Sequence, residues 1–490
     1  MFDVAIIGAG IVGSSIARNL SRYNLKTVVL EKGVEVCQGT TKANSAIVHG
    51  GFDAKEGSLK AKLNVIGCKM YPSLCEELSV EYKNNGSLVL AFSKEDMKHV
   101  HELYERGLTN GVAELEIIDK AKIMEIEPNV NKNVVGALWC KSSGIVCPFN
   151  LNIALMENAM INGVQLKLEN EVIDIKRIDE ENCFEIKTNK ELIKSKYVIN
   201  AAGVYSDKIN NLIGGDEFYI IPRKGEYKIL DKSEGYKANH TLFTCPTEKG
   251  KGVLVTQTVH ENLLVGPNAQ VVEREDITTS KAGLREIMEG GKKSIDNIDF
   301  SKTITSFSGV RATPNTGDFM IFKSQVAKGF INAGGIESPG LASAPAIALY
   351  VEDLLKEIMS EEDIYLEGNE NFNSIRMKNK PFMKMNQEEQ IENLNKDKKY
   401  QTIICRCENI TEAEIVDAIN RPCGAKTVDG VKRRVRPGMG RCQGGFCGPK
   451  VVEIIARELN MNVEEILKDY ENSNMLVGKV KEVRGETVEI

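Results

Sequence analysis

The sequence lacks several features that would assign it to a broad class. No apolar run approaches the roughly 20 residues that span a bilayer, which excludes an integral membrane protein. Neither sign of charge dominates: 63 Lys and Arg against 69 Asp and Glu give a net charge of −6, which does not indicate binding to nucleic acid or to a membrane surface. The expected first strand begins at Phe2 and leaves no room for a secretory signal, so we expect a cytoplasmic protein.

Cysteine, in contrast, is plentiful, with twelve residues among 490. A chain of this length is expected to form two to four domains, and in a large cytosolic protein the cysteines are expected to be thiols or metal ligands. Four of them form two close pairs near the C-terminus. The other eight are scattered, and we interpret them as small buried apolar side chains: Cys37, Cys68, Cys75, Cys140, Cys147, Cys183, Cys245 and Cys423.

The N-terminus predicts a nucleotide site. Residues 2–7 form an apolar run typical of a buried parallel strand, residues 12–23 have helical periodicity, and a second apolar strand ends at Glu31. Between them, Gly8 permits a tight turn, Gly10 lets the backbone approach a pyrophosphate, and Gly13 allows close helix–sheet packing. The helix N-terminus favours phosphates, and Glu31 can accept hydrogen bonds from a ribose. This pattern alone does not separate FAD from NAD.

Three later segments rich in small residues extend this prediction. They are a polar loop at 39–51, a strand leading into small residues at 197–209, and a strand followed by a small-residue helix at 329–355. Such units converging on one ligand indicate a long dinucleotide lying along a domain. The cofactor-binding candidates in these segments are Thr40, Thr41, Asn44, Ser45, Ala202, Gly203, Gly334, Gly335, Gly340 and Leu341.

On these motifs, residues 1–360 resemble the glycine-oxidase-like (D-amino-acid oxidase) superfamily of FAD-dependent oxidoreductases. The resemblance implies FAD and an α/β fold, in which a discontinuous doubly wound FAD-binding domain carries an inserted mixed-sheet substrate domain. We expect the FAD-binding domain in 1–75, 146–215 and 306–360, and the substrate domain in 76–145 and 216–305. The polar stretch up to residue 400 is expected to be an extended linker, over 361–400.

Substrate is expected between the flavin and the strands of the second insertion. Arg311, in SGVRATPNTGD, is the candidate anion clamp, because the resemblance implies an arginine there and a guanidinium forks onto carboxylate or phosphate. A structural salt bridge is the alternative. Arg223, Lys224 and Tyr227, in PRKGEY, are secondary candidates, and Lys224 is the one we expect to assist catalysis.

Only five histidines are available as a catalytic base. His49 follows the small-residue loop and is expected near the flavin, where it could take a hydroxyl proton while hydride leaves the substrate. A structural role or a covalent flavin link are the alternatives for His49. His240 and His260, near turns of the insertion, are alternative bases, whereas His99 and His101 lie in a charged helical stretch and are expected to be solvated.

The segments GVLVTQTVHENLLVGPNA and ESPGLASAPAIA resemble the catalytic subunits of anaerobic glycerol-3-phosphate dehydrogenases. That resemblance implies oxidation of sn-glycerol 3-phosphate to dihydroxyacetone phosphate. It also implies a second flavoprotein subunit, a small iron–sulfur or cysteine-rich subunit, and attachment to a membrane through a partner. Such enzymes usually carry an arginine shortly after the His-Gly pair, but this chain has Asp53 and no arginine. The segment NSAIVHGGFDAKEGSLKAKL resembles 2-hydroxyglutarate oxidases equally. The alternative functions are therefore oxidation of a 2-hydroxy acid or of an amino acid, and a non-catalytic role in electron transfer.

The paired cysteines predict a metal centre in residues 401–455. Cys405-x-Cys407 and Cys442-x₄-Cys447 depart from the usual structural zinc spacing, and four such thiolates suit two sulfide-bridged irons. The pattern resembles the bacterioferritin-associated-ferredoxin-like (BFD-like) [2Fe–2S] domain, with zinc or an empty site as alternatives and Cys423 as a spare thiol. A cluster carries single electrons onward, which favours a dehydrogenase over an oxidase.

Two further features flank the expected centre. Helix-capping residues Thr411 and Glu414 precede an apolar helical stretch, and a closing helix is expected in PKVVEIIARELN. The C-terminal tail, 456–490, is expected to end in a small strand segment over 471–490. A basic run precedes the third cysteine and is expected to stabilise the negative cluster or to bind an acidic electron-transfer partner: Lys432, Arg433, Arg434, Arg436 and Arg441.

Overall fold

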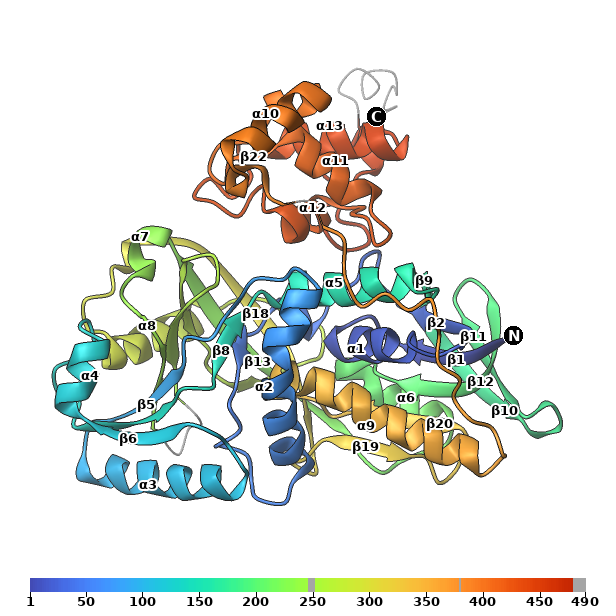
Figure 1. Ribbon diagram of the computed structural model, residues 1–490, viewed down its shortest axis with the longest axis horizontal. Coiled ribbons are helices and arrows are strands. Elements are labelled where there is room, and N and C mark those ends of the chain that lie inside the picture. The colour runs from blue at the N-terminus through green and yellow to red at the C-terminus, as the bar shows by residue number, and fades with distance from the viewer. Residues whose placement is uncertain (246–251, 379, 479–490) are drawn as a thin grey trace, which may run out of the picture. The chain divides into compact units, whose positions relative to one another are not determined.

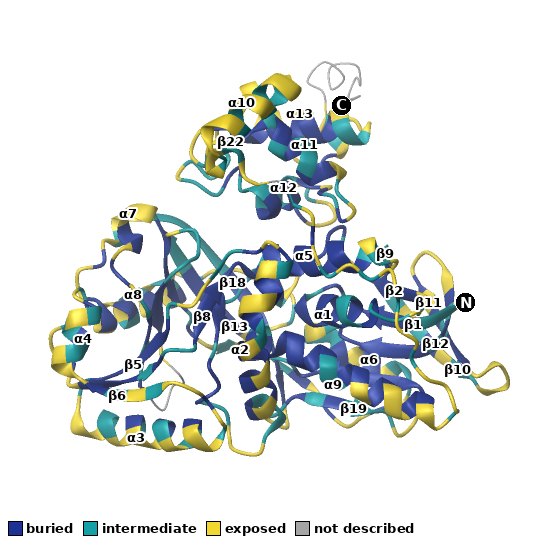
Figure 2. Cartoon of the chain, viewed as in Figure 1, coloured by how far each residue is buried: buried dark blue, intermediate teal, exposed yellow. Residues whose placement is uncertain are grey.

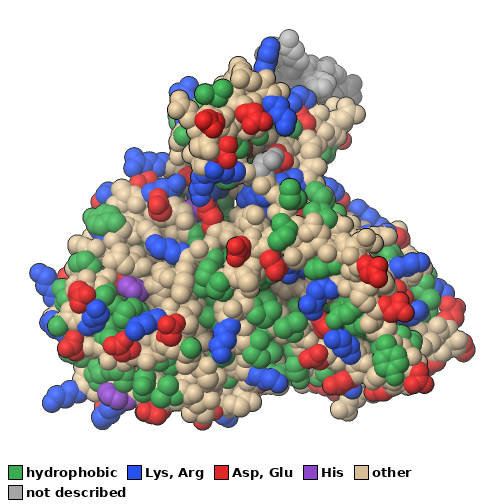
Figure 3. Space-filling view, in the orientation of Figure 1, with side chains coloured by type: hydrophobic (Ala, Val, Ile, Leu, Met, Phe, Trp, Pro, Cys, Tyr) green, Lys and Arg blue, Asp and Glu red, His purple; other side chains and the backbone are tan. Residues whose placement is uncertain are grey.

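The structure is a computed structural model that describes residues 1–245, 252–378 and 380–478. It divides into two compact units. The first comprises Met1–Lys32 and Cys37–Met377, and the second comprises Gly33–Val36 and Lys378–Ile490. Within each unit, buried residues are concentrated on the strands and on the inner sides of the helices, and α5 is buried almost all round (Figure 2). Lysines, arginines and acidic residues are interspersed on the face drawn in Figure 3.

An eight-stranded sheet forms one half of the first unit (Figure 1). β1 runs parallel to β2 on one side and to β12 on the other, and β12 is parallel to β20. The apolar run of β1 is buried because helices cover a parallel sheet on both faces. The strands are β1 (Phe2–Ile7), β2 (Thr27–Leu30), β9 (Gln165–Lys167), β10 (Val172–Ile178), β11 (Cys183–Thr188), β12 (Leu192–Asn200), β19 (Met320–Lys323) and β20 (Phe330–Gly334).

The helices beside this sheet pack tightly on one another. α1 contacts both α5 and α9, and α2 contacts α9. Gly67 permits that last approach, because a Cβ at this position would overlap the carbonyl oxygen of Ala342. No helix within the described ranges is both long and apolar enough to cross a membrane. The helices are α1 (Ile11–Leu20), α2 (Leu59–Glu77), α5 (Pro148–Ile161), α6 (Ser206–Leu212) and α9 (Gly340–Ser360).

A nine-stranded mixed sheet, which we call the roof sheet, forms the other half of the first unit (Figure 1). β13 pairs antiparallel with β18 along almost its whole length, and β5 pairs parallel with β14. The expected α/β fold with an inserted mixed sheet is therefore confirmed. The strands are β5 (Ser87–Ala91), β6 (Leu115–Asp119), β7 (Gly136–Cys140), β13 (Ile220–Leu230), β14 (Thr241–Thr244), β15 (Leu254–Gln257), β16 (Leu263–Gly266), β17 (Gln270–Val271) and β18 (Thr303–Pro314).

Helices and a small sheet complete the first unit. α8 packs on β13, where the backbone N–H of Ser280 donates to the buried Glu226 carboxylate at 3.1 Å. The remaining elements are α3 (Lys94–Thr109), α4 (Lys120–Ile126), α7 (Lys232–Gly235), α8 (Lys281–Ser294) and a three-stranded sheet of β3 (Ile47–Val48), β4 (Tyr82–Lys83) and β8 (Gly144–Val146).

The second unit is small and mainly helical. Thr411 and Glu414 form the capping box predicted from the sequence, and the expected closing helix is present as α13. Ile415, Val431 and Ile455 lie in its apolar core. Its elements are α10 (Gln387–Lys396), β21 (Ile403–Cys405), β22 (Ile410–Thr411), α11 (Glu412–Asn420), α12 (Val428–Val435) and α13 (Gly448–Leu459). Of the expected terminal strand segment, residues 479–490 lie outside the described ranges.

The stretch expected to be an extended linker has two different parts. Near its start, Asn369 donates its backbone N–H to the carbonyl of Arg22, and Arg376 forms a buried ion pair with Glu157 of α5 at 2.5 Å. Further on, α10 begins with a capping box between Asn386 and Glu389. The capping residues explain why this polar stretch forms a helix without a wide apolar face.

Candidate functional site

The turn after β1 has the shape that its glycines predict. Gly8 has a φ of +105°, and a Cβ there would lie 2.5 Å from the carbonyl oxygen of Ala201. A Cβ on Gly13 would overlap the carbonyl oxygen of Gly8, so α1 packs directly on the turn. Gly10 precedes α1 and offers no capping side chain to its first N–H groups. The positive end of the helix is thus available to a phosphate.

Two side chains from later in the chain bind this turn. The backbone N–H of Ala9 donates to Glu31 Oε2 at 2.8 Å, and that of Ile11 donates to Thr41 Oγ1 at 3.0 Å. Glu31 directly follows β2, so its carboxylate lies at the carboxyl edge of the sheet beside the turn. This is the place at which an acid can accept hydrogen bonds from a ribose.

The predicted polar loop joins the nucleotide turn to the roof sheet. Thr40 Oγ1 donates to the carbonyl of Val310 in β18 at 2.6 Å, and Ser45 Oγ lies 3.4 Å from Tyr227 Oη in β13. The Asn44 amide bridges the loop, because it donates to the carbonyl of Thr41 at 2.8 Å and accepts from the N–H of Ala46. The loop is therefore fixed at both ends.

The remaining cofactor candidates lie where strands of the first sheet end. Since β1, β12 and β20 are parallel neighbours, their carboxyl ends meet at one edge, which is where ligands bind in such sheets. Gly8, Glu31 and the start of α1, whose N-cap residue Gly10 has no side chain, lie at the same edge. Together these residues fit a dinucleotide. The candidates are Ala202 and Gly203 after β12, Gly334 and Gly335 at the end of β20, and Gly340 and Leu341 at the start of α9.

The β13–β18 pairing decides which roof side chains face this loop. Gly309 faces it, because a Cβ there would overlap the carbonyl of Ala43. Arg311 lies two residues further along β18 and so on the same face. Its Nη2 donates to the carbonyl of Asn268 at 2.7 Å, and a Cβ on Gly225 would overlap that nitrogen. Arg311 thus projects on the loop side, as expected of an anion clamp.

Lys224 lies on the other face of β13. It neighbours Gly225, and side chains alternate along a strand. Its ammonium is buried and ion-paired with Asp276 at 2.7 Å, and this hydrogen bond lowers the pKa of the Asp276 carboxyl to about 2. The structure therefore does not bring Lys224 together with Arg311, contrary to our expectation that it assists catalysis.

His49 directly follows β3 and packs its ring on Phe243 of the roof sheet, with ring centroids 5.8 Å apart. Asn64 of α2 donates to its carbonyl at 2.6 Å and fixes the backbone there. The other four histidines lie against other partners. His240 pairs with Glu127, His260 with Glu81 and His99 with Glu102, while His101 Nδ1 contacts the carbonyl of Met97.

A polar cluster that we did not anticipate lies at the loop-side end of β18. Thr313 Oγ1 donates to Glu337 Oε2 at 2.6 Å, and Lys60 forms an ion pair with Glu337 Oε1 at 2.8 Å. Glu337 belongs to the loop between β20 and α9, among the cofactor candidates. The sequence could have indicated Thr313, because two residues that are two apart on one strand, as Arg311 and Thr313 are, project on the same face.

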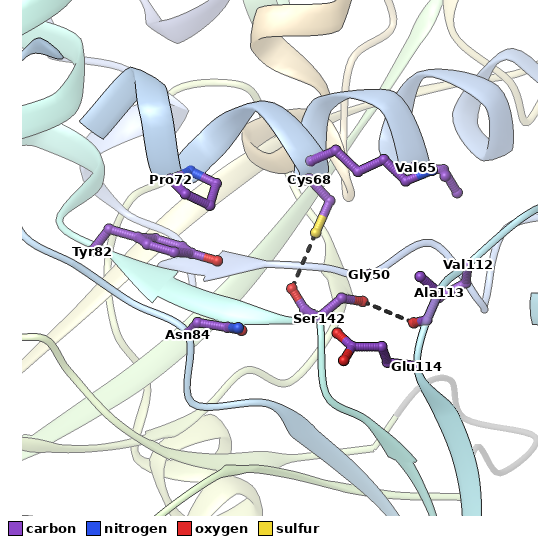
Figure 4. A pocket seen from close by; sticks show the side chains of 11 residues that line it. Gly50, Val65, Cys68, Pro72, Tyr82, Asn84, Val112, Ala113, Glu114 and Ser142 are labelled. Atoms are coloured by element: carbon purple, nitrogen blue, oxygen red, sulfur yellow. Dashed lines mark hydrogen bonds between the residues drawn. The ribbon is translucent and has the colours of Figure 1, made fainter. Parts of the chain in front are cut away.

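A cavity of about 140 Å³ lies beside Gly50, the neighbour of His49 (Figure 4). Two of its polar side chains are hydrogen-bonded within the wall: Cys68 Sγ donates to the carbonyl of Ser142 at 3.3 Å, and Ser142 Oγ donates to the carbonyl of Ala113 at 3.3 Å. Burial raises the pKa of the Cys68 thiol to about 12, which makes it unreactive. Cys68 is therefore not a candidate nucleophile in this cavity.

The four paired cysteines come together in the second unit. Cys407 Sγ and Cys442 Sγ lie 3.7 Å apart, and two sulfurs bound to one tetrahedral metal at ~2.3 Å would be separated by about 3.8 Å. Cys447 donates a hydrogen bond to Cys405, and this bond, with backbone N–H groups including that of Gly438, lowers the pKa of the Cys405 thiol to about 5. Four thiols in two close pairs fit a [2Fe–2S] cluster. The eight scattered cysteines are buried, as predicted.

The basic run before Cys442 is mostly engaged within the second unit. Three of its arginines form ion pairs: Arg433 with Asp469 at 2.8 Å, Arg434 with Glu35 at 2.9 Å and Arg436 with Glu408 at 2.9 Å. Carboxylates neutralise these three arginines, which weakens the positive field that we expected the basic run to place near the cluster.

Comparison with known proteins identifies the two parts. Residues 3–354 match the family described as FAD dependent oxidoreductase. The chain belongs to this family. Residues 403–457 match the BFD-like [2Fe-2S] binding domain, which covers all four paired cysteines. The FAD-dependent oxidoreductase therefore binds FAD in its first unit and a [2Fe–2S] cluster in its second, as the sequence predicted.

Individual relatives agree with this assignment. The chain is 52% identical over 482 residues to a glycerol 3-phosphate dehydrogenase of Caloramator mitchellensis, covering 98% of this chain and 99% of the relative. It is 35% identical to a glycerol 3-phosphate oxidase of Mycoplasma genitalium, covering 72% and 94%. Among solved structures, L-alpha-glycerophosphate oxidase from Mycoplasma pneumoniae with FAD bound matches with a TM-score of 0.72 at 30% identity, covering 76% and 98%.

The glycine positions give a test of the FAD site. Gly13→Ala should sharply lower the flavin content of the purified protein, because the added Cβ forces α1 away from the turn. Gly368→Ala is the matched control, since a Cβ there meets nothing within 4 Å and the residue lies outside the cofactor segments. The ratio of flavin absorbance to protein measures the effect, and equal flavin content in both variants would contradict the assigned turn.

The cysteine pairs give a test of the cluster. Cys442→Ser should lose the iron, of which about two atoms per chain are expected, while the flavin is retained. Cys423→Ser, which changes a buried thiol outside the two pairs, should keep iron near the wild-type content. Iron analysis and the visible spectrum report both outcomes. A zinc content that falls in Cys442→Ser would instead identify a zinc site.

Proposed function

We propose that this protein is a dehydrogenase that oxidises sn-glycerol 3-phosphate to dihydroxyacetone phosphate. The observation that carries the proposal is the nearly full-length match to a glycerol 3-phosphate dehydrogenase at 52% identity. The Mycoplasma genitalium oxidase covers only 72% of this chain although 94% of its own length is matched. The additional C-terminal part of this chain holds the cluster. A cluster passes electrons on one at a time, which supports a partner protein as the electron acceptor and not oxygen.

The side chains suggest a division of labour. Arg311 would hold the anionic end of the substrate through its charged guanidinium, with one nitrogen fixed by the Asn268 carbonyl. His49 would accept the hydroxyl proton as the carbon–hydrogen bond breaks, and its backbone is held by Asn64 for that purpose. When bound, FAD supplies the acceptor for the hydride and its two electrons, and the [2Fe–2S] cluster supplies their exit one at a time.

A second candidate is an L-2-hydroxyglutarate dehydrogenase. Relatives with that activity in their names, from Nematostella vectensis and Homo sapiens, are 28% and 31% identical to this chain. The segment after His49 carries Asp53 and no arginine, which favours a carboxylate substrate over a phosphate. Arg311 would then hold a carboxylate in place of a phosphate.

Location and partners extend the proposal. Cluster assembly needs four reduced thiols, which supports a reducing compartment such as the cytoplasm. We also propose that a second flavoprotein subunit and a small iron–sulfur or cysteine-rich subunit take up the electrons and attach the enzyme to a membrane. Co-purification of the chain at its native expression level, followed by identification of bound chains, tests that assembly.

The substrate is tested by anaerobic flavin reduction. Addition of sn-glycerol 3-phosphate to the oxidised holoenzyme should bleach the flavin absorbance rapidly, whereas L-2-hydroxyglutarate and amino acids should not. Bleaching by L-2-hydroxyglutarate alone would replace the proposal with the second candidate. If no compound bleached the flavin, the chain would act as an electron-transfer subunit without a substrate of its own.

The base is tested in the same assay. His49→Gln should slow flavin reduction by about 10²- to 10⁴-fold, because the variant loses the proton acceptor, while the substrate concentration at half-maximal rate changes little. His101→Gln is the control. His101 lies on α3, where its ring contacts the carbonyl of Met97, and the flavin of this variant should be reduced at the wild-type rate. A wild-type rate in His49→Gln would assign the base elsewhere.

A further inference from the structure

The roof sheet places a second arginine beside Arg311. In the antiparallel register of β13 and β18, Arg223 is directly opposite Arg311. Directly opposite residues of an antiparallel pair project on the same face, with Cβ atoms about 4.5–5.5 Å apart. Two guanidinium groups therefore start from neighbouring points on one side of the sheet.

Neighbouring pairs show that this face is the one above the cofactor loop. The pair Gly225–Gly309 follows in register, and Gly309 abuts the loop at Ala43. Tyr227, next along the same face of β13, reaches Ser45 of that loop. Lys224 and Glu226 alternate to the opposite face, where Glu226 binds the start of α8.

The charges on this face are not balanced. Within the described residues, neither Arg223 nor Arg311 forms an ion pair, and Arg311 makes its one hydrogen bond to the neutral Asn268 carbonyl. Like charges directly opposite on a sheet repel each other. Arg223 also pairs with Val271 of β17, on the side of β13 away from β18. Both Arg223 and Val271 are exposed, so the sheet is open to solvent here. The pair is arranged to receive an anion from solution.

We propose that Arg223 and Arg311 together form a phosphate clamp, with Arg223 supplying the charge that the segment after Gly51 lacks. This inference rests on the proposed function and specifies its substrate class. A phosphate monoester carries nearly two negative charges at neutral pH and several acceptor oxygens, which suits two forked guanidinium groups. Each carboxylate of a dicarboxylate such as L-2-hydroxyglutarate carries one charge and two oxygens, which a single forked guanidinium already matches. Arg223 is thus a binding and specificity residue, and it does not touch the reacting carbon.

The test uses holoenzyme variants and two readouts. Arg223→Gln should raise the substrate concentration for half-maximal flavin reduction by sn-glycerol 3-phosphate roughly 10- to 100-fold, with little change in the limiting rate. Arg223→Lys should recover part of this loss. Arg285→Gln is the matched control, because it removes an exposed arginine from α8, on the opposite side of β13. Calorimetric binding of inorganic phosphate to each oxidised holoenzyme provides a readout that needs no turnover.

The outcomes separate the clamp from the proposed function. If the wild type is reduced by sn-glycerol 3-phosphate and Arg223→Gln behaves like Arg285→Gln in both readouts, the clamp is wrong and the function stands. If the wild type is not reduced but binds phosphate through Arg223, the function is wrong and the clamp stands. Failure of the wild type both to be reduced and to bind phosphate overturns both.

Discussion

The chemistry of the first unit depends on the hydrogen-bonded ladder between β13 and β18. This ladder determines which side chains of two neighbouring strands face the loop that follows the nucleotide turn. Gly225 and Gly309 are required on that face, because a side chain at either position would overlap Arg311 or the loop itself. A shift of β18 by one residue would exchange its two faces and would turn Arg311 away from the loop.

The second unit depends on a different constraint, which is the pairing of its buried charges. Glu35, in the short segment Gly33–Val36, accepts hydrogen bonds from the backbone N–H groups of Lys426 and Thr427 and from Arg434. Both Glu35 and Arg434 are buried, and breaking such a pair on one side costs about 3–5 kcal/mol. A segment from near the N-terminus thereby becomes part of the unit that holds the four cysteines.

The sequence predicted the elements that depend on local rules. Gly8 and Gly13 have short-range steric roles, the Thr411–Glu414 capping box is a four-residue pattern, and the cysteine spacing specifies its own ligand set. Long-range relations were less accessible. Alternation separates Lys224 from Arg223 on β13, but only the pairing with β18 shows which of them shares a face with Arg311. Likewise, composition reveals a basic run, and the structure alone assigns carboxylate partners to three of its arginines.

The two units also explain why one chain combines two redox groups. Oxidation of a secondary alcohol to a ketone removes two electrons as a hydride from carbon, and a proton leaves the hydroxyl group. An iron–sulfur cluster accepts electrons singly, so a chain with both groups can release to a one-electron partner what the substrate delivers as a pair. The Mycoplasma genitalium oxidase is matched over 94% of its length by only 72% of this chain. The remaining residues of this chain include the cluster unit, so the chain holds a second redox group through which the electrons would leave one at a time.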